Sequence, residues 1–361
     1  MTNQGFMETF TVKAYNTMWQ SLYQSQDPAS VYGKPDELIE IDEEIIDALK
    51  ALIAAEGLHD NPGRLEAIIR LEKAQIKAVE QGFLDEWYGS QARVAFVEEL
   101  SKRGIYEIHE KPELMPGSIY VPWSLSWTPY FLWLIPSLFV YLTLFMSGSD
   151  SRSRQTDNLL PINLVGMLCQ RLLIGMVFVF AMVAASLLPA FVWATARNGP
   201  GVLNYPIVKA IGEGSGQVVG VGRPGDEVGS QAISGQTEFM SAGQYIIQFL
   251  VLITFASLFV GVIVMLVSRF TDNPLVPAGI SVAIVLIPSF SGYSSLRLLW
   301  LLPLDLAPIS YLDYQNVIGR FFIPGSPPTA FVFEQGLLIM IVSALVLVMI
   351  ACIIAVVMRR A

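Results

Sequence analysis

The chain has 361 residues, of which 53% are hydrophobic and only 15% are charged, whereas about 25% of residues are charged in a typical soluble domain. Residues 1–125 carry 32 of the 53 charged side chains, 21 acidic and 11 basic, so the net charge of −9 arises almost wholly there. This composition excludes an ordinary soluble globular protein, and the acidic excess argues against nucleic acid as a partner.

The N-terminal segment, residues 1–125, is predicted to be helical and not a catalytic domain. Residues 36–56 and 64–81 place apolar side chains three and four positions apart, which is the spacing of amphipathic helices. The string Asn61-Pro62-Gly63 separates them, and a third helix is expected over residues 84–103. No strand-like alternation occurs there, so a helical hairpin or small bundle is expected.

The rest of the chain, residues 126–361, is predicted to be a transmembrane domain. A helical run of about 20 apolar residues crosses about 30 Å of hydrocarbon while satisfying its own backbone hydrogen bonds. About five runs meet this criterion: residues 127–146, 164–194, 245–267, 276–304 and 333–358. The chain is therefore predicted to be an all-α polytopic membrane protein with the lipid bilayer as a partner.

Two of these runs have features of their own. The first is entered through Trp123, Trp127 and Tyr130, which is typical of an interfacial aromatic belt. The fourth is interrupted by proline, serine and glycine between residues 288 and 292. A broken helix or a re-entrant pair is expected there, because proline removes a backbone hydrogen bond.

Arginines between and after the runs predict which side faces the cytoplasm. They follow the first run, follow the third run and end the chain: Arg152, Arg154, Arg269, Arg359 and Arg360. Successive loops alternate between the two sides of a membrane, and these arginines fall in every second position, so they all lie on one side, the cytoplasm. We therefore expect a plasma-membrane topology with a cytoplasmic C-terminus and residues 1–125 outside the cell. Residues 1–20 hold no continuous apolar run of a signal peptide. Either a further span precedes Met1, which we favour, or residues 1–125 are translocated with the first span.

Residues 212–229 are rich in glycine but do not form a known phosphate-binding motif. A P-loop needs G-x-x-x-x-G-K-[ST] between a strand and a helix, and no such string occurs in the chain. We expect a flexible extracytoplasmic loop here and no hydrolysis of ATP by this chain alone. Cys169 and Cys352 lie in apolar runs, which favours small buried side chains over a disulfide or a metal site. No bound cofactor is expected.

Four ionisable residues lie within or beside the predicted spans and are candidates for intramembrane polar roles. They are Arg171, Arg297, Asp305 and Glu334. Each lies near a predicted span end, where a charged side chain reaches the interface at little cost, so a structural role is the competing interpretation. The spans have no central carboxylate or histidine, and the chain has no H-E-x-x-H string. An enzyme is therefore not predicted.

The segment at residues 149–163 is short and polar, and it turns apolar at Leu159. By the arginine rule it lies in the cytoplasm between two spans. It is either a docking surface for a soluble partner or an ordinary loop.

Three strings in the chain resemble the permease subunits of type 2 ABC exporters, in particular Gram-positive members. Residues 158–162 (NLLPI) resemble their cytoplasmic turn. Residues 197–207 (RNGPGVLNYPI) are similar to a stretch that follows the next span, and residues 306–314 (LAPISYLDY) resemble an extracytoplasmic turn before the last span. The resemblance covers about residues 120–361.

The resemblance implies six spans, a second permease half in a homo- or heterodimer, and a separate ABC ATPase subunit that hydrolyses ATP. It also implies that the ATPase docks on the cytoplasmic segment, for which the expected contacts are Arg152, Arg154, Asp157, Asn158 and Leu160. The alternative is a non-transporting membrane sensor or immunity protein that binds a peptide through its outer segment. An intramembrane enzyme is disfavoured because polar side chains do not converge at mid-membrane.

Overall fold

The computed structural model describes residues 36–80, 91–109, 112–146, 164–210, 237–268, 270–271, 273–290, 307–318 and 332–360. The chain divides into two compact units, Met1–Ile108 and His109–Ala361. The sequence placed this boundary near residue 125 instead. The structure divides the chain earlier because the helix that begins at Gly117 packs against helices of the second unit.

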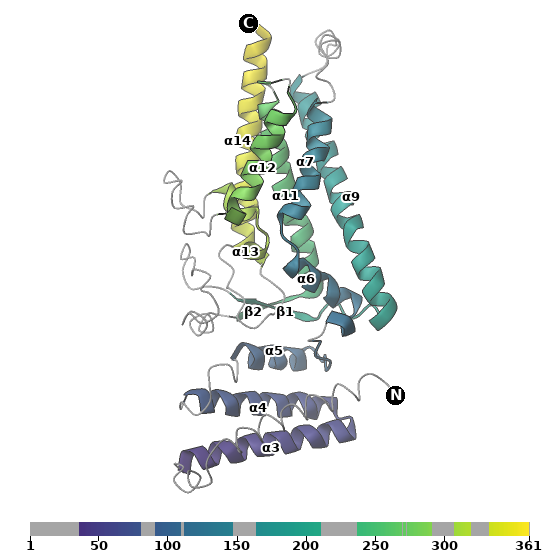
Figure 1. Cartoon of the computed structure of the whole chain (residues 1–361), viewed down its shortest axis with the longest axis vertical. Helices are drawn as coiled ribbons and strands as arrows, with labels where there is room; N and C mark the ends of the chain where they lie inside the picture. Colours follow the sequence, from purple (N-terminus) through teal and green to yellow (C-terminus); the bar gives the residue numbers. More distant parts are fainter. Residues whose placement is uncertain are drawn as a thin grey trace. The chain divides into compact units, whose positions relative to one another are not determined.

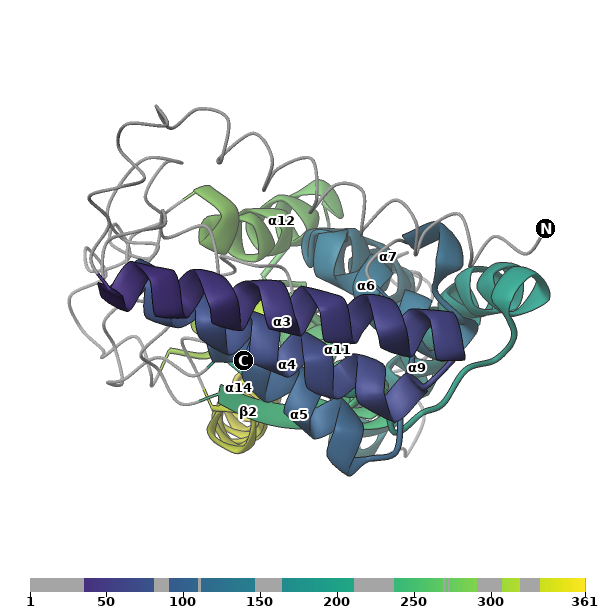
Figure 2. The same ribbon diagram turned by 90° about the horizontal axis from the view of Figure 1, so that it is seen from below.

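The first unit contains helices α3 (Asp36–Leu58), α4 (Asn61–Glu80) and α5 (Gln91–Lys102). Helices α3 and α4 form a hairpin and lie side by side (Figure 2). Small and branched apolar residues fill the space between them: Ile41, Ile45, Ala48, Leu71, Ala74 and Ala78. Three alanines in this core let the two helices approach closely, and the predicted helical hairpin is confirmed.

Ion pairs join the three helices across their exposed edges. Lys77 on α4 lies 3.1 Å from Glu44 on α3, and Lys73 lies 2.8 Å from Glu98 on α5. The hydrogen bond that Lys77 donates to Glu44 is the main cause of the raised pKa of Lys77. Such exposed pairs fix the register of the helices more than they stabilise them.

The second unit is a helical bundle with a small sheet at one end (Figure 1). Its longer helices are α6 (Gly117–Trp127), α7 (Phe131–Met146), α9 (Leu164–Asn198), α11 (Ala242–Val267), α12 (Leu275–Phe290) and α14 (Phe333–Arg360). Its short elements are η1 (Pro112–Leu114), β1 (Pro206–Ala210), β2 (Thr237–Ser241), η4 (Pro308–Tyr311) and α13 (Gln315–Ile318). Helices α7, α11 and α14 run toward the end that holds the C-terminus, and α9 and α12 run the other way (Figure 1).

Among the described residues, three helices are long and apolar enough to cross a membrane, namely α9, α11 and α14. Helices α6 and α7 pass the same test only as a pair, and they are bent by 84° where they meet. Helix α12 is apolar but shorter. The membrane class is thus supported with three or four candidate spans, while a count of five or six remains a prediction. Helix α12 continues through Pro288 and Ser289 to Phe290, so the expected break does not begin there, and Ser291 and Gly292 lie outside the described part of the chain.

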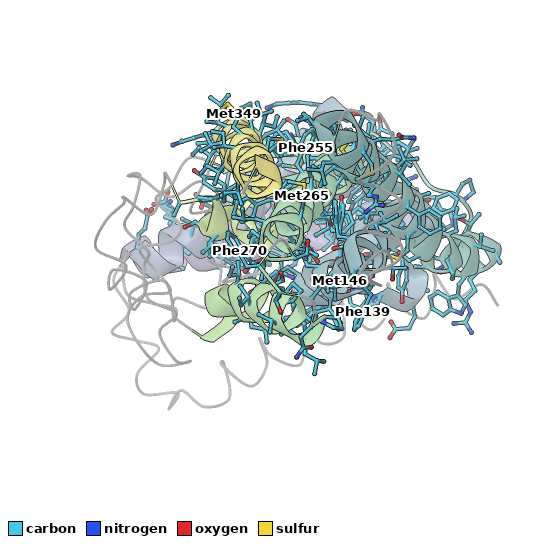
Figure 3. The ribbon with its side chains drawn as sticks, turned by 90° about the horizontal axis from the view of Figure 1, so that it is seen from above. Phe139, Met146, Phe255, Met265, Phe270 and Met349 are labelled. Atoms are coloured by element: carbon cyan, nitrogen blue, oxygen red, sulfur yellow. The ribbon has the colours of Figure 1, made fainter. Side chains whose placement is uncertain are left out.

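Helix α11 is the central helix of the bundle. Within its most apolar window 67% of the residues are buried, against 28% for α9 and 17% for α14. In the view from above, Met265 of α11 lies inside the bundle, whereas Phe139 of α7 and Met349 of α14 lie at its rim (Figure 3). Helices α9 and α14 therefore present long apolar faces outward, as helices in contact with lipid do.

The small sheet departs from the all-α expectation. Strands β1 and β2 pair antiparallel, with Pro206 opposite Ser241 and Ala210 opposite Thr237. The sequence did not predict them because each strand is only five residues long and its partner lies across residues 211–236. Those residues, which include the predicted glycine-rich loop, lie outside the described part of the chain.

Three helices meet at Tyr141, which is fully buried. Its ring on α7 lies against Gly175 of α9 and Gly261 of α11. A Cβ built on Gly261 would lie 2.6 Å from ring carbons of Tyr141, which is too close for any real contact. The two glycines therefore form the notch that lets α7 pack against both neighbours.

We predict that Gly261→Ala destabilises the chain by about 1–3 kcal/mol, because the added methyl group overpacks the notch. Gly279→Ala on α12 is the matched control, since a Cβ there meets nothing within 4 Å. Both changes raise helix propensity equally, so the difference between them isolates the clash. Thermal unfolding of the purified chain in detergent measures it, and equal midpoints for the two variants would contradict the packing argument.

Candidate functional site

The structure brings none of the sequence-predicted site residues together among those it describes. Arg171 is half-buried in the second turn of α9, and Glu334 is exposed in the first turn of α14. These two helices begin at opposite ends of the bundle (Figure 1). The remaining candidates lie outside the described residues: Arg152, Arg154, Asp157, Asn158, Leu160, Arg297 and Asp305.

Chemical groups for catalysis or metal binding do not gather in the described part of the chain. No cluster of three or more His, Cys, Asp or Glu side chains there is arranged to hold a metal ion. Hydrogen bonds between segments far apart in the sequence instead gather at the two ends of helix α6, which lies at the end of the second unit opposite the C-terminus (Figure 1). We therefore take the surroundings of α6 as the candidate site.

The N-terminal end of α6 is held by the turn that follows α9. Asn198, the last residue of α9, donates from its amide nitrogen Nδ2 to the carbonyls of Glu113 at 2.9 Å and Met115 at 3.0 Å. Gly199 and Gly201 have φ angles of +82° and +71°, a left-handed conformation that only glycine adopts without strain. This conformation turns the chain sharply back toward the start of α6.

The same turn supplies acceptors for the first N–H groups of α6, which have no partner inside the helix. The N–H of Gly117 donates to the carbonyl of Gly199 at 3.0 Å, and that of Ser118 donates to the carbonyl of Pro200 at 2.9 Å. The Ser118 hydroxyl adds a bond to the carbonyl of Val202 at 3.2 Å. The turn therefore caps α6 with main-chain carbonyls rather than with a side chain.

The turn is also tied to α11 and to the start of the second unit. The N–H groups of Ala242 and Gly243 donate to the carbonyls of Tyr205 and Leu203, each at 2.9 Å. The buried Tyr205 hydroxyl accepts from the backbone N–H of His109 at 3.2 Å. Residues 198–205 thus join α6, α9 and α11 at one point.

The C-terminal end of α6 is held by the segment between η4 and α13. The Tyr314 hydroxyl lies 2.5 Å from the carbonyl oxygen of Leu125 and 2.6 Å from that of Thr128, so its single proton is shared between them. Nε2 of Gln315 lies 3.1 Å from the carbonyls of Ser126 and Thr128. These carbonyls are exposed by the bend between α6 and α7, and they find donors here.

Burial and ring packing fix Tyr314 in place. Its ring contacts Phe249 of α11 edge-on, with the ring centroids 4.8 Å apart, and Phe249 in turn contacts Trp133 of α7. Burial raises the pKa of the Tyr314 hydroxyl well above its ordinary value, so the group stays protonated and remains a donor. Nearby, the ring of the buried Tyr311 packs against Gly336 at the start of α14.

We call the two segments that hold α6, residues 198–205 and residues 314–315, the α6 cradle. Both lie within strings that suggested the family resemblance or directly follow one, yet the sequence assigned them no structural role. The Asn-Gly-Pro-Gly string is a recognised turn signal, but no local signal shows that Tyr314 and Gln315 reach residues 125–128.

One residue of the predicted aromatic belt lies elsewhere. Tyr130 is only 4% exposed, and its hydroxyl donates to the carbonyl of Val285 on α12 at 2.7 Å. It therefore joins α7 to α12 inside the bundle. Trp123 and Trp127 remain on the outer face of α6.

Comparison of the chain with models of known protein families, with curated proteins and with solved structures found no match. Its function is therefore inferred from its own residues and their geometry.

We predict that Gly201→Ala destabilises the chain more than Gly199→Ala. Both changes place a side chain in the left-handed region, at a cost of about 1–2 kcal/mol. Only at Gly201 does the new Cβ also meet Pro116 Cγ at 2.7 Å and Ser118 Oγ at 2.5 Å, and overpacking of this kind adds about 1–3 kcal/mol. The unfolding midpoints of the two variants provide the measurement, and identical midpoints would refute the role of Gly201 in the cradle.

We also predict that Tyr314→Phe and Gln315→Leu are non-additive. Each single change leaves the other side chain within reach of the Thr128 carbonyl, so each costs about 1 kcal/mol or less. The double variant leaves buried carbonyls without a donor, and its cost should exceed the sum of the two by about 1–2 kcal/mol. Unfolding of all three variants in detergent, with Tyr106→Phe in the first unit as control, tests this coupling. Strict additivity would count against it.

Proposed function

We propose that the chain is the membrane-spanning permease subunit of a type 2 ABC exporter, which forms the substrate path while a separate ATPase subunit hydrolyses ATP. The observation that carries the proposal is the α6 cradle. Two of the three strings that resemble the exporter family, at residues 197–207 and 306–314, converge on the same helix. Strings that resemble a family only by chance have no reason to meet in space.

The distribution of charge supports an external source of energy. Helices α7, α11 and α12 contain no Asp, Glu, Lys, Arg or His, and the charged residues of α9 and α14 lie near their ends. A transporter driven by protons or ions needs ionisable groups near mid-membrane. The described helices offer none, which favours work supplied by a partner.

Helix directions support the predicted sidedness. Helix α7 ends, α9 begins and α14 ends at the same end of the bundle (Figure 1). Arg171 lies near the start of α9, and α14 ends in Arg359 and Arg360. Basic residues gather on the cytoplasmic side of membrane proteins. This end is therefore the cytoplasmic one in our proposal, and the α6 cradle is at the outer end.

Helices α6 and α7, which meet at the bend, provide a path for the proposed coupling between the ATPase and the outer end of the bundle. Helix α7 runs from the bend at the outer end to Met146, directly before the expected docking segment at residues 149–163. A shift of that segment on ATP binding would be transmitted along α7 to the cradle. Coupling of this kind needs an element with two arrangements that the nucleotide biases, and the joint between α6 and α7 is our candidate.

The exposed apolar faces of α9 and α14 are available to contact lipid and a second permease half, the other expected partners. Large side chains on these faces are exposed, among them Phe178 on α9 and Leu345 on α14. In our proposal they contact lipid or the second permease half. The first unit, residues 1–108, forms the extracytoplasmic segment in this proposal.

The test is a charge reversal in the expected docking segment. We predict that Arg152→Glu combined with Arg154→Glu abolishes co-purification of an ABC ATPase from native membranes, because the docking surface changes sign. Membrane insertion should be unchanged. The control is Lys50→Glu combined with Lys102→Glu, which reverses two exposed lysines of the first unit and should leave the ATPase bound.

Two outcomes would contradict the proposal. Normal recovery of the ATPase with the double arginine variant would remove the docking assignment. Recovery of no ATPase with the unmodified chain would favour the alternative, a membrane sensor or immunity protein that works without an ATPase.

A further inference from the structure

The outer face of α6 carries a row of aromatic rings. The opposite face is buried in the bundle and consists of Gly117, Ser118, Ile119, Val121, Pro122, Leu125 and Ser126. On the outer face the ring centroids of Tyr120 and Trp123 are 5.4 Å apart, and those of Trp123 and Trp127 are 6.4 Å apart. Trp127 is 60% exposed. An exposed indole is stable where its ring contacts an apolar phase and its N–H contacts a polar one.

The row continues onto the last two turns of α9. The rings of Tyr120 and Trp193 are 5.1 Å apart, and the guanidinium carbon of Arg197 lies 4.6 Å above the ring of Trp193. Trp193 is 42% exposed. We call Tyr120, Trp123, Trp127, Trp193 and Arg197 together the aromatic strip.

The aromatic strip lies between an apolar surface and a polar one. Toward the middle of α9, Leu188 and Val192 are exposed. On the other side, the exposed residues 201–204 of the α6 cradle follow directly after α9. Tryptophan and tyrosine prefer this boundary in membrane proteins, because one part of each ring system is apolar and another forms hydrogen bonds.

Lengths and angles place α6 along a membrane surface rather than across a membrane. Helix α7 has 16 residues and spans about 24 Å at 1.5 Å per residue, slightly less than the hydrocarbon thickness of about 30 Å. The 84° bend then turns α6 nearly perpendicular to α7. If α7 spans the bilayer, α6 lies close to its plane, with the aromatic strip at headgroup level.

Arg197 is the only cation of the aromatic strip, and the described residues supply it with no ion pair. Its guanidinium rests on Trp193, and its donors are available for an anion. A guanidinium binds phosphate through two parallel hydrogen bonds, and an aromatic face beneath it attracts the cation. The headgroup layer is where phosphate occurs at high density next to an apolar phase.

We propose that the aromatic strip anchors α6 in the headgroup layer of the bilayer, with Arg197 bound to a lipid phosphate. The partner is a phospholipid, because the aromatic row needs the boundary of an apolar phase while Arg197 needs an anion. The anchor does not depend on the ATPase, so it stands or falls separately from the exporter proposal. Its consequence is that α6 stays at a fixed depth while α7 moves.

The depth of α6 can be measured on the full chain in liposomes of phosphatidylcholine and phosphatidylglycerol. A nitroxide is attached at Ser124→Cys, between Trp123 and Trp127, in a Cys169→Ala, Cys352→Ala background. Its collision rates with oxygen and with a soluble nickel chelate report depth. We expect values typical of the headgroup layer. Values typical of bulk water overturn the proposal, and so does a label shielded from both reagents, which indicates a protein or a second copy on the aromatic strip.

The Arg197 site can be tested by titrating the detergent-solubilised chain with phosphatidylglycerol and counting bound lipids by native mass spectrometry. Arg197→Gln should weaken binding about fivefold, as expected for one cation near a lipid surface, and Arg197→Lys should restore part of it. The control Arg70→Gln, at an exposed arginine of the first unit, should bind like the unmodified chain. A diacylglycerol, which lacks the phosphate, should not distinguish the variants. Unchanged affinity in Arg197→Gln overturns the phosphate assignment.

Discussion

The bend between α6 and α7 creates the constraint on which the outer end of the second unit depends. A bend of 84° interrupts the helical hydrogen-bond ladder, and the carbonyls of Leu125, Ser126 and Thr128 accept from donors outside α6. Near lipid these carbonyls cannot rely on water, so protein donors must reach them. Tyr314 and Gln315 are those donors. The chain can bend here because a segment almost 190 residues further along completes its hydrogen bonds.

The N-terminal end of α6 has the same requirement for hydrogen-bond partners, but here the helix supplies the donors and the partners supply the acceptors. There the helix exposes N–H donors, and the carbonyls of Gly199 and Pro200 accept from them. The left-handed glycines of this turn keep the acceptors in position. A helix of 11 residues is marginal on its own, so the position of α6 is set by these two contacts and by its buried face. Because the cradle segments border α9, α11 and α14, the position of α6 is linked to most of the bundle.

The sequence predicted the helices that depend on local composition and spacing. It missed the features that depend on contacts with residues far away in the chain. Helices α9, α11 and α14 follow from the length of their apolar runs, and α3 and α4 follow from helical spacing interrupted at Asn61-Pro62-Gly63. The predicted span at residues 127–146 does not reveal that the chain bends between α6 and α7, because the donors that permit the bend come from residues 314–315. Tyr130 was assigned to the surface by its neighbours in sequence, but its hydroxyl contacts α12. Strands β1 and β2 were missed for the same reason, since each needs the other.

The cradle end and the rest of the bundle therefore differ in the kind of contact that holds their segments in place. At the cradle end, main-chain groups of four segments share hydrogen bonds, and the loss of several of these bonds together leaves buried polar atoms unpaired. Along the helices the contacts are apolar, apart from bonds such as that of Tyr130, and apolar surfaces slide past one another at lower cost than hydrogen bonds break. The notch at Tyr141 is a contact of this second kind, in which a ring rests on two glycines. In the exporter proposal the ATPase acts at the end away from the cradle, so the work of the nucleotide would change the angle between α7 and α6 at their joint while α6 keeps its position.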